Sequence, residues 1–371
     1  MDKKYQKGMM IGLFILAILV ACSNKEQVNT PDVTVRLIED INEMNLDSVP
    51  FVVNSFERRN VFLFDLLTNE KIAEFIAPEE DMQFFQPRRI GENYYGVFGL
   101  IGFDGSIHLY GDGTVNIDVI FYLLDEQLNL IEAVEITDSH LIINDYRAII
   151  LYEEERLTFL YPFWHHIYSY CPHTNETTVI ADLQAHIPRD IQLMGEKQLA
   201  FWATIVDDEE NIHYGLVDLE TNEIQSFSQS NFRQSGFHVY GNYVVITENA
   251  PVGDQSQTII LDALTGETNL IELDGYRDAK LVYGGHFMLT KETDWLDSET
   301  HYVIRLYDVA TQELMFEHEF VFDERNRRID FSELLTIDEG IYALTILSSN
   351  QFQIETLEFE TLFIIIEEVE E

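Results

Sequence analysis

Positive charge is the scarcest feature of this sequence. Only 22 Lys and Arg residues stand against 66 Asp and Glu residues, so the 371-residue chain has a formal net charge of −44 at pH 7. A chain this acidic repels phosphate backbones and gains nothing from counterion release. The composition therefore argues against nucleic-acid binding.

Cysteine is almost absent, and disorder is excluded. The chain has two cysteines, Cys22 and Cys171, and the first is expected to be consumed by N-terminal processing. One thiol then remains, so no internal disulfide can form. Since 46% of the residues are hydrophobic and 12% aromatic, the fold must depend on its core, with material for one or two domains.

The N-terminus has no hydrophobic run long enough to span a bilayer comfortably. Lys3, Lys4 and Lys7 precede an apolar run over residues 9–20, which is the layout of a secretory signal. The run ends Leu-Val-Ala-Cys at residues 19–22, which resembles the bacterial lipobox. An ordinary signal peptide, or a buried helix with an incidental cysteine, is the alternative.

The lipobox resemblance implies lipidation of Cys22 after removal of a signal peptide at residues 1–21. Residues 22–32 would then be the lipidated cysteine and a short polar tether, and residues 33–371 the folded domain. Two acyl chains anchor a protein stably to a membrane. We therefore expect an extracytoplasmic, membrane-anchored protein, in a Gram-positive envelope in preference to a Gram-negative periplasm.

A repeat of about 46 residues organises the rest of the chain. Each copy has a strand ending in Asp, then Thr three residues later, then Asn, Gly or Gln before Glu. The clearest copies lie at residues 61–70, 215–223, 259–267 and 305–313, with weaker ones near 122–128, 170–176 and 354–362. The Asp carboxylate can accept turn amides and Asn or Gly supplies a positive φ, so the motif predicts a hairpin.

A second hairpin signal precedes the repeated motif, as at residues 236–246, 280–289 and 334–344. Four strands in every 40 to 50 residues are typical of a β-propeller, because each sheet has two apolar faces that neighbouring sheets cover. We therefore predict an all-β, seven-bladed β-propeller, with six or eight blades as the error range and a two-sheet sandwich as the rival. Residues 33–38 are either the first inner strand or a strand that pairs with the last blade.

The segment Asp-Ala-Leu-Thr-Gly-Glu at residues 262–267 resembles the hairpin of PQQ-like and YVTN-type bacterial propeller repeats. The resemblance implies a propeller and no particular activity. PQQ-type repeats usually end this hairpin with a Trp, whereas residues 72–75, 224–227 and 314–316 carry Ile, Leu and Phe here. The sequence therefore favours no quinone cofactor, and blades packed through aliphatic and Phe side chains.

Metal chemistry has weak support. His165, His166, Cys171 and His173 are close in sequence, but a strand would place His165 and Cys171 about 20 Å apart, so they cannot share one ion. Cys171 and His173 could form a pair, although a packed thiol beside a solvated histidine is favoured.

Calcium is the one ion that the sequence could accommodate. The loop at residues 98–118 carries Asp104, Asp112, Asn116 and Asp118 near several Gly, which suits calcium ligands, but its spacing matches no EF-hand. The acidic run at residues 207–210 is expected to be a solvated loop. We expect no metal or cofactor, with calcium as the exception to test.

Two tight groups of arginines stand out because arginine is scarce. They are Arg58 with Arg59, in the predicted loop between the second and third strands of the first blade, and Arg325, Arg327 and Arg328, in the loop before the last blade. Both loops are expected on one face, where they could form an anion-binding spot. Pairing of the second group with neighbouring acids is the alternative.

Four aromatic residues are expected on loops of the same face: Tyr110, Tyr161, Phe163 and Trp295. Exposed aromatics can stack on sugars or clamp a peptide, or they can pack against the blades. The sequence thus predicts a binding or scaffolding protein with an unknown protein or glycan partner. The alternative is an extracellular hydrolase or lyase acting on polysaccharide, with acids around the central channel as catalytic groups. A third possibility is a role like that of the Gram-negative outer-membrane assembly lipoprotein, which is also an anchored propeller, and it rests on analogy alone. No catalytic residue is assigned.

Overall fold

The fold is known from a computed structural model, which describes residues 33–38, 48–54, 58–68, 70–85, 87–91, 93–103, 117–143, 148–184, 186–195, 197–205, 208–230, 233–249, 255–274, 277–296, 299–322, 327–338, 340–348 and 360–368. The expected signal peptide, Cys22 and the tether lie outside these residues. The contacts divide the chain into two units, residues 1–34 with 368–371 and residues 35–367, and the second unit contains nearly all of the strands. No helix within the described ranges is long and apolar enough to cross a membrane.

The described strands form seven sheets, and consecutive strands along the chain pair antiparallel within them. The first sheet has three described strands: β2 (Pro50–Asn54), β3 (Asn60–Asp65) and β4 (Glu70–Ile76). The second has β5 (Met82–Phe84), β6 (Arg88–Ile90), β7 (Tyr94–Ile101), β8 (Asp118–Asp125) and β9 (Leu130–Ile136), where β5 and β6 both pair with β7. The short helix α2 (Ser139–Ile143) follows.

Four sheets of four strands come next along the chain. The third sheet has β10 (Ile149–Glu153), β11 (Arg156–Phe163), β12 (His166–Cys171) and β13 (Glu176–Asp182), and the fourth has β14 (His186–Met194), β15 (Gln198–Ile205), β16 (Asp208–Asp218) and β17 (Ile224–Ser230). The fifth sheet has β18 (Arg233–Tyr240), β19 (Tyr243–Asn249), β20 (Gln255–Asp262) and β21 (Thr268–Asp274). The sixth has β22 (Arg277–Val282), β23 (Phe287–Leu296), β24 (Glu299–Asp308) and β25 (Leu314–Phe322).

The last sheet joins the two ends of the chain. Its order is β26 (Arg327–Asp338), β27 (Ile341–Ser348), β28 (Glu360–Glu368) and then β1 (Val33–Ile38). Arg36 and Glu367 form an exposed ion pair at 3.0 Å across this junction. Of the two predictions for residues 33–38, pairing with the last sheet is confirmed.

The repeated motif forms the predicted turn. The Asp218 carboxylate accepts hydrogen bonds from the amides of Glu220 (2.9 Å) and Thr221 (2.8 Å), and Asn222 takes a φ of +59°. The same acceptor role recurs at Asp65, Asp125, Asp262 and Asp308. A side-chain oxygen that satisfies turn amides fixes the turn, so the hairpin predicted from the motif is confirmed.

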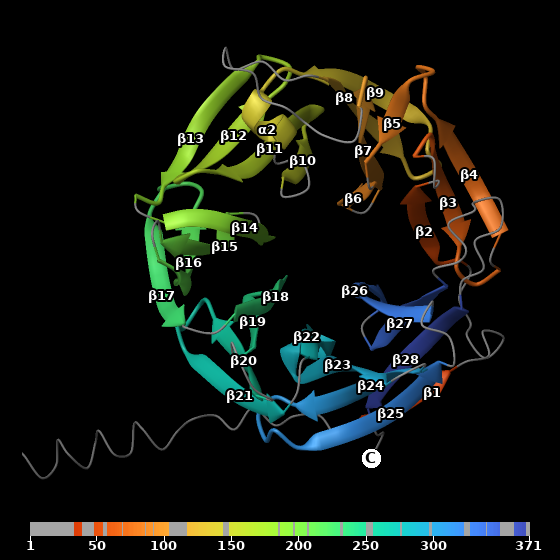
Figure 1. Cartoon of the computed structure of the whole chain (residues 1–371), viewed down its shortest axis with the longest axis vertical. Coiled ribbons are helices and arrows are strands. Elements are labelled where there is room, and N and C mark those ends of the chain that lie inside the picture. Colours follow the sequence, from red (N-terminus) through yellow and green to blue (C-terminus); the bar gives the residue numbers. More distant parts are fainter. Residues whose placement is uncertain are drawn as a thin grey trace, which may run out of the picture. The chain divides into compact units, whose positions relative to one another are not determined.

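Each sheet buries its faces against the sheets before and after it. Between the β5–β9 sheet and the β10–β13 sheet, Phe121 packs with its ring centroid 5.0 Å from that of Phe98 and 5.0 Å from that of Phe159. Corresponding apolar clusters join the later sheets. Within this unit the sheets follow one another around a common centre (Figure 1). The fold is a β-propeller, and the contacts are aliphatic and Phe in character, as predicted.

Candidate functional site

The strands nearest the centre carry an unusual balance of charge. We call β2, β5, β6, β10, β14, β18, β22 and β26 the inner strands, since they form the inner edge of their sheets (Figure 1), with β5 and β6 both paired to β7. Together they contain eight Lys and Arg residues and six Asp and Glu residues. The eight basic residues are Arg88, Arg89, Arg189, Arg233, Arg277, Lys280, Arg327 and Arg328.

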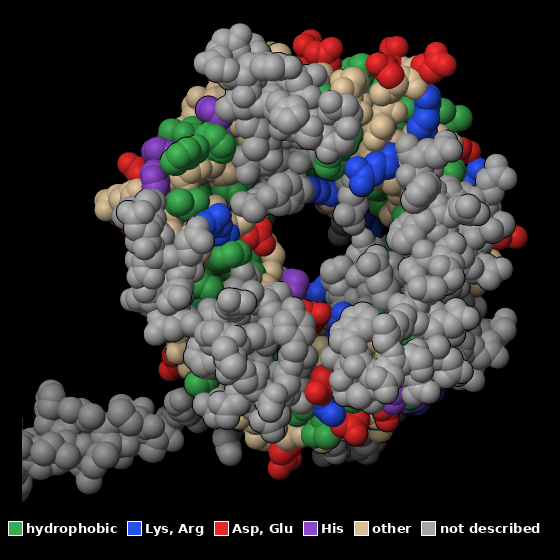
Figure 2. Space-filling model, in the orientation of Figure 1, with side chains coloured by type: hydrophobic (Ala, Val, Ile, Leu, Met, Phe, Trp, Pro, Cys, Tyr) green, Lys and Arg blue, Asp and Glu red, His purple; other side chains and the backbone are tan. Residues whose placement is uncertain are grey.

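The strands at the outer edge carry the opposite balance. We call β1, β4, β9, β13, β17, β21 and β25 the outer strands; they contain ten Asp and Glu residues and two basic residues, Arg36 and Lys71. Charged side chains on an edge strand discourage pairing with other chains. Figure 2 shows Lys and Arg side chains around the opening at the centre of the unit. The scarce positive charge of this acidic chain is therefore concentrated on the inner strands.

Hydrogen bonds fix several of the inner-strand side chains. Arg88 donates to the carbonyl oxygen of Ala148 at 2.6 Å, and Ala148 directly precedes the inner strand of the next sheet. Arg189 donates from Nε to Oγ1 of Thr204 at 3.0 Å. Because these contacts cross between strands or sheets, they hold the guanidinium groups in defined places.

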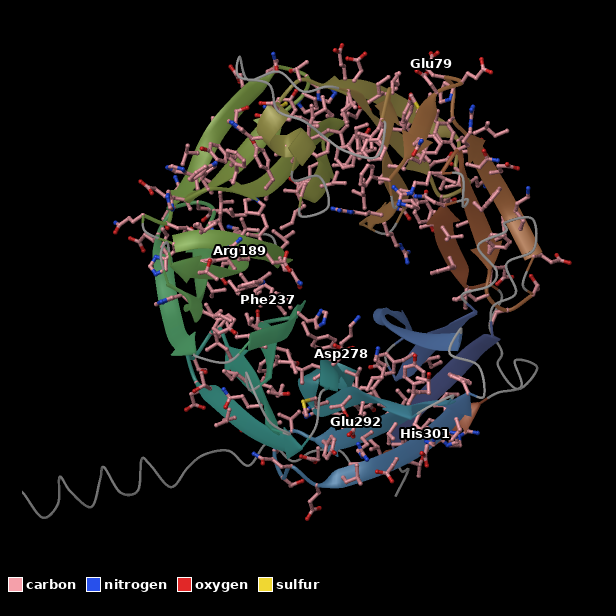
Figure 3. All side chains as sticks on the ribbon, viewed as in Figure 1. Glu79, Arg189, Phe237, Asp278, Glu292 and His301 are labelled. Atoms are coloured by element: carbon pink, nitrogen blue, oxygen red, sulfur yellow. The ribbon has the colours of Figure 1, made fainter. Side chains whose placement is uncertain are left out.

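The inner strands β14, β18 and β22 meet side by side, as the labelled Arg189, Phe237 and Asp278 show in Figure 3. Gln192 of β14 donates to the carbonyl oxygen of Phe237 and accepts from the amide of Val239 at 2.9 Å, which ties β14 to β18. Asp278 of β22 pairs with Lys291 at 3.1 Å.

His238 lies among these charges and is neutral at pH 7. Burial, and then the positive charge of Lys280, lower its pKa to about 4 against the opposing effect of Asp278. Two nearby sheets thus contribute a neutral imidazole, a lysine and an aspartate to the inner strands. Guanidinium and ammonium groups in such a setting bind carboxylates, phosphates or sulfates through charge-assisted hydrogen bonds.

The comparisons with known proteins give no family. No family model and no curated protein match the chain. Similar solved structures include an oligogalacturonate lyase from Vibrio parahaemolyticus (12% identity, covering 90% of this chain and 86% of that chain, TM-score 0.47) and the β-propeller domain of the Trilobed protease from Pyrococcus furiosus (14%, 72% and 80%, 0.45). Another is the WD40 domain of SCAP from fission yeast (6%, 83% and 80%, 0.42). At these values no function transfers, and the β-propeller assignment rests on the sheet topology.

The predicted arginine groups lie in two kinds of place. Arg58 and Arg59 are in the β2–β3 connection, as expected; Arg59 donates to the carbonyl oxygens of Glu79 and Glu80. Arg327 and Arg328 are the first residues of β26, so the expectation that they lie in a loop is wrong. Their side chains, and all of Arg325, are outside the described residues, which leaves the shared anion site a prediction.

The predicted aromatic residues do not form an exposed set. Tyr161 is fully buried in β11, and its hydroxyl donates to Asp138 at 2.9 Å, so its predicted exposure is wrong: in a sheet covered on both faces, either side of the strand faces the core. Burial, and then the charge of Asp138, raise the pKa of Tyr161. Phe163 is half-buried, with its ring 4.2 Å from that of His140. Tyr110 and the side chain of Trp295 lie outside the described residues.

The exposed aromatic that the sequence did not predict is Trp164, which is 64% exposed. It lies between Phe163 and His165, in the two-residue turn that joins β11 to β12. The register of the two flanking strands was the signal that could have placed it at a hairpin tip.

Cys171 is buried and lies beside the partly exposed His173, in line with the favoured interpretation of a packed thiol next to a turn histidine. His173 donates from Nε2 to the carboxylate of Glu132 at 2.7 Å. The side chains of Arg156 (3.2 Å from Sγ) and His173 both hydrogen-bond Cys171. In the described part of the chain, no three His, Cys, Asp or Glu residues are grouped so that they could hold a metal ion. Asp104, Asp112 and Asn116 lie outside that part, and Asp118 begins β8, so the calcium prediction stays untested.

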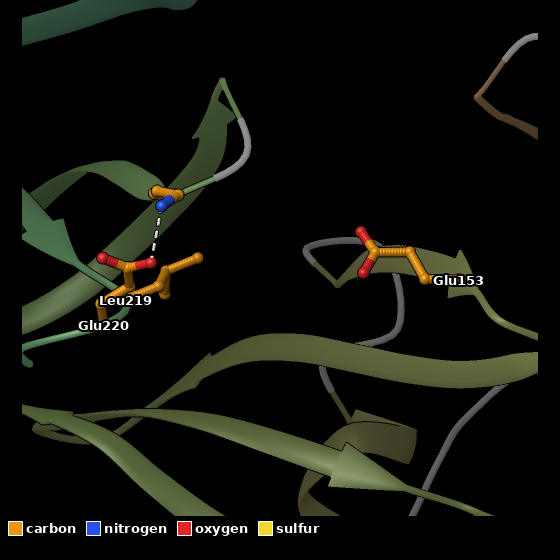
Figure 4. A pocket seen from close by; sticks show the side chains of 4 residues that line it. Glu153, Leu219 and Glu220 are labelled. Atoms are coloured by element: carbon orange, nitrogen blue, oxygen red, sulfur yellow. Dashed lines mark hydrogen bonds and ion pairs between the residues drawn. The ribbon is translucent and has the colours of Figure 1, made fainter.

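An open depression of about 380 Å³ lies between the β10–β13 and β14–β17 sheets (Figure 4). Glu153, Lys197, Leu219 and Glu220 line it. Lys197 and Glu220 form an exposed ion pair at 2.7 Å, so the lysine there is already matched by a carboxylate. We assign no ligand to this depression.

Proposed function

We propose that this chain is an extracytoplasmic, lipid-anchored, seven-bladed β-propeller that binds an anionic ligand among its inner strands. The observation that carries the proposal is the reversal of charge between the inner strands, with eight basic and six acidic residues, and the outer strands, with two basic and ten acidic residues. A uniformly acidic surface serves solubility, but it gives no reason to gather cations at the centre.

An anionic ligand fits the side chains that the inner strands offer. Arg88, Arg189 and Lys280 come from three different sheets, and hydrogen bonds to charged groups are each worth about 1.5–3 kcal/mol. The acidic outer strands would repel the same ligand elsewhere on the molecule. The expected lipid anchor at Cys22 would hold this site at the outer face of the membrane, where acidic envelope glycans or small anions are available.

The enzymatic alternative is less well supported by the central residues. A general base works best with a pKa near the operating pH. His238, one of two histidines on the inner strands, has its pKa lowered to about 4 and is therefore a weak base at neutral pH. Binding is the function that this chemistry favours.

Calorimetric titration tests the proposal with citrate and with a galacturonate trimer as probes. The double variant Arg89→Gln with Lys280→Gln removes two positive charges from the inner strands. The matched control, Arg36→Gln with Lys197→Gln, removes two from the exposed pairs with Glu367 and Glu220. We expect the central variant to weaken binding about tenfold or more and the control to leave binding unchanged.

Equal affinities in the two double variants would refute a central anion site. The anchor is tested separately, by metabolic labelling with a fatty acid in the native host and in a Cys22→Ser variant. Label that persists without Cys22 would refute lipidation at this residue.

A further inference from the structure

A second concave site lies on the β14–β17 sheet, and none of the inner-strand cations lines it. It is a cavity of about 210 Å³ that we call the His186 pocket. Its lining residues come from the connection after β13 and from β14, β15, β16 and β17: Asp182, Leu183, Gln184, His186, Phe201, His213 and Ile224. No Lys or Arg is among them.

One wall of the His186 pocket is polar and held by hydrogen bonds. His186 Nδ1 lies 3.0 Å from the carbonyl oxygen of Leu183, which can only accept, so in the neutral imidazole Nε2 carries the lone pair. Gln184 takes a φ of +56°, and its amide donates to Asp182 at 2.9 Å, which fixes the turn that presents the Gln184 side chain. This wall offers both donors and acceptors.

The other wall is apolar. Phe201 and Leu183 are buried, while Ile224 is 42% exposed at the start of β17. The rings of His186 and His213 meet edge to face with centroids 4.5 Å apart, so their carbon edges extend the apolar surface. The cavity therefore has one hydrogen-bonding side and one apolar side.

Trp164 is joined to this pocket through the next residue of its turn, His165, which contacts the lining residues His186 and Leu183. His165 packs against Trp164 with ring centroids 6.1 Å apart, and its Nδ1 donates to the carbonyl oxygen of His186 at 3.3 Å. This contact ties the Trp164 turn to the pocket wall. Figure 2 shows His and hydrophobic side chains gathered at the outer edge of the unit.

The conformation of Trp164 is unfavourable for the fold alone. Its φ of +51° lies in the left-handed region, where glycine and asparagine are preferred and a bulky side chain is an outlier. The side chain is also 64% exposed, so it regains little packing energy in return. Strain of this kind points to a role outside folding.

We infer that the His186 pocket and Trp164 bind an uncharged saccharide. A pyranose ring has hydroxyls around its edge and apolar C–H faces, which matches a cavity with one polar and one apolar wall and an exposed indole joined to it through His165. An acidic sugar would meet the Asp182 carboxylate with no Lys or Arg in the lining to offset it. The His186 pocket should therefore prefer uncharged ligands, whereas the inner strands should prefer anions.

Titrations with glucose, N-acetylglucosamine and their β-1,4-linked trimers test this inference. Trp164→Asn should keep or raise the melting temperature, because asparagine tolerates a positive φ, and should weaken binding of a neutral trimer about fivefold or more. Ile224→Ser should weaken it similarly. Leu314→Ser is the matched control, since Leu314 is 50% exposed and directly follows the same turn motif in the β22–β25 sheet.

Two results would overturn the inference: no neutral saccharide binding at millimolar concentration, or binding that Trp164→Asn and Ile224→Ser leave unchanged. Binding restricted to the galacturonate trimer would also overturn it. The Arg89→Gln, Lys280→Gln variant separates the two sites, because neutral-saccharide binding should survive in it. Failure of the central anion site would therefore leave this inference standing.

Discussion

Cys171 takes the place of aspartate in its copy of the turn motif, and we expect it to be a thiolate at neutral pH. Asp218 opens the equivalent turn with a carboxylate that accepts two turn amides. At Cys171 the sulfur accepts from the amide and hydroxyl of Thr174 and from Nε of Arg156 at 3.2 Å. A thiolate acceptor therefore does here what a carboxylate does elsewhere.

The magnitude follows from the pKa. Burial raises the pKa of Cys171, but the hydrogen bonds from Arg156, Thr174 and His173 outweigh it and bring the pKa from 9.0 to about 6. That difference corresponds to a preference for the thiolate of about 4 kcal/mol at most, and to about nine-tenths ionisation at pH 7. Because the folded pKa is the lower one, the stability gained from the thiolate is complete above pH 9 and is lost as the pH falls through about 6.

Alkylation of the Cys22→Ser protein by iodoacetamide across this pH range measures the pKa directly, since burial slows the reaction but does not move its midpoint. We expect a midpoint near 6, and a higher one in Arg156→Gln. Cys171→Asp should keep the melting temperature at pH 7, whereas Cys171→Ala should lower the free energy of unfolding by about 1–3 kcal/mol. A midpoint at the ordinary thiol value, or equal stability of the Asp and Ala variants, would refute the reasoning.

Urea denaturation tests three further predictions. Asp138→Ala should destabilise the protein by about 2 kcal/mol, because Asp138 caps α2 and accepts from Tyr161; a loss under half of that would contradict the shared role. Thr290→Val should raise the free energy of unfolding by about 1 kcal/mol, since Oγ1 of this fully buried side chain has no hydrogen-bond partner in the described part of the chain. A lower free energy of unfolding would mean that a water molecule hydrogen-bonds the Thr290 hydroxyl. Gln312→Gly should stabilise by about 0.5 kcal/mol, as Gln312 has a φ of +61° where Gly266 stands in the preceding repeat; no gain would show that the strain is relieved elsewhere.

Local chemistry explains why the turns and the strand count per repeat could be predicted. Asp, Thr and a residue suited to positive φ act within six positions of one another, so the motif carries its own geometry, as at 218–223. The junction of β1 with β28 was predicted only as one of two options. Pairing between residues as far apart as Arg36 and Glu367, which are separated by 331 positions, leaves no local signal.

The site depended on information that no short segment contains. Arg88, Arg189 and Lys280 are about 100 residues apart along the chain, and their strands face one common centre only once each inner strand has taken its place in the fold (Figure 1). The sequence instead favoured arginines that are adjacent in the chain. The prediction that Tyr161 lies on a loop failed for a related reason. An aromatic residue in a loop and one near the end of a strand look alike in sequence, and only the pairing register of β11 with β12 shows that Tyr161 belongs to the strand.

A structural role for the inner-strand cations has to be weighed against a binding role. Arg88 does satisfy the carbonyl oxygen of Ala148, and Arg189 the hydroxyl of Thr204. Such bonds need a donor but not a positive charge, and Gln192 makes the equivalent contact to Phe237 and Val239 with a neutral amide. If holding the sheets together were the whole reason, glutamine could serve at each position. The six acids on the same strands offer these cations partners within the fold, and the proposed anionic ligand would add to such pairs, so the titrations of the central and control variants decide between the two roles.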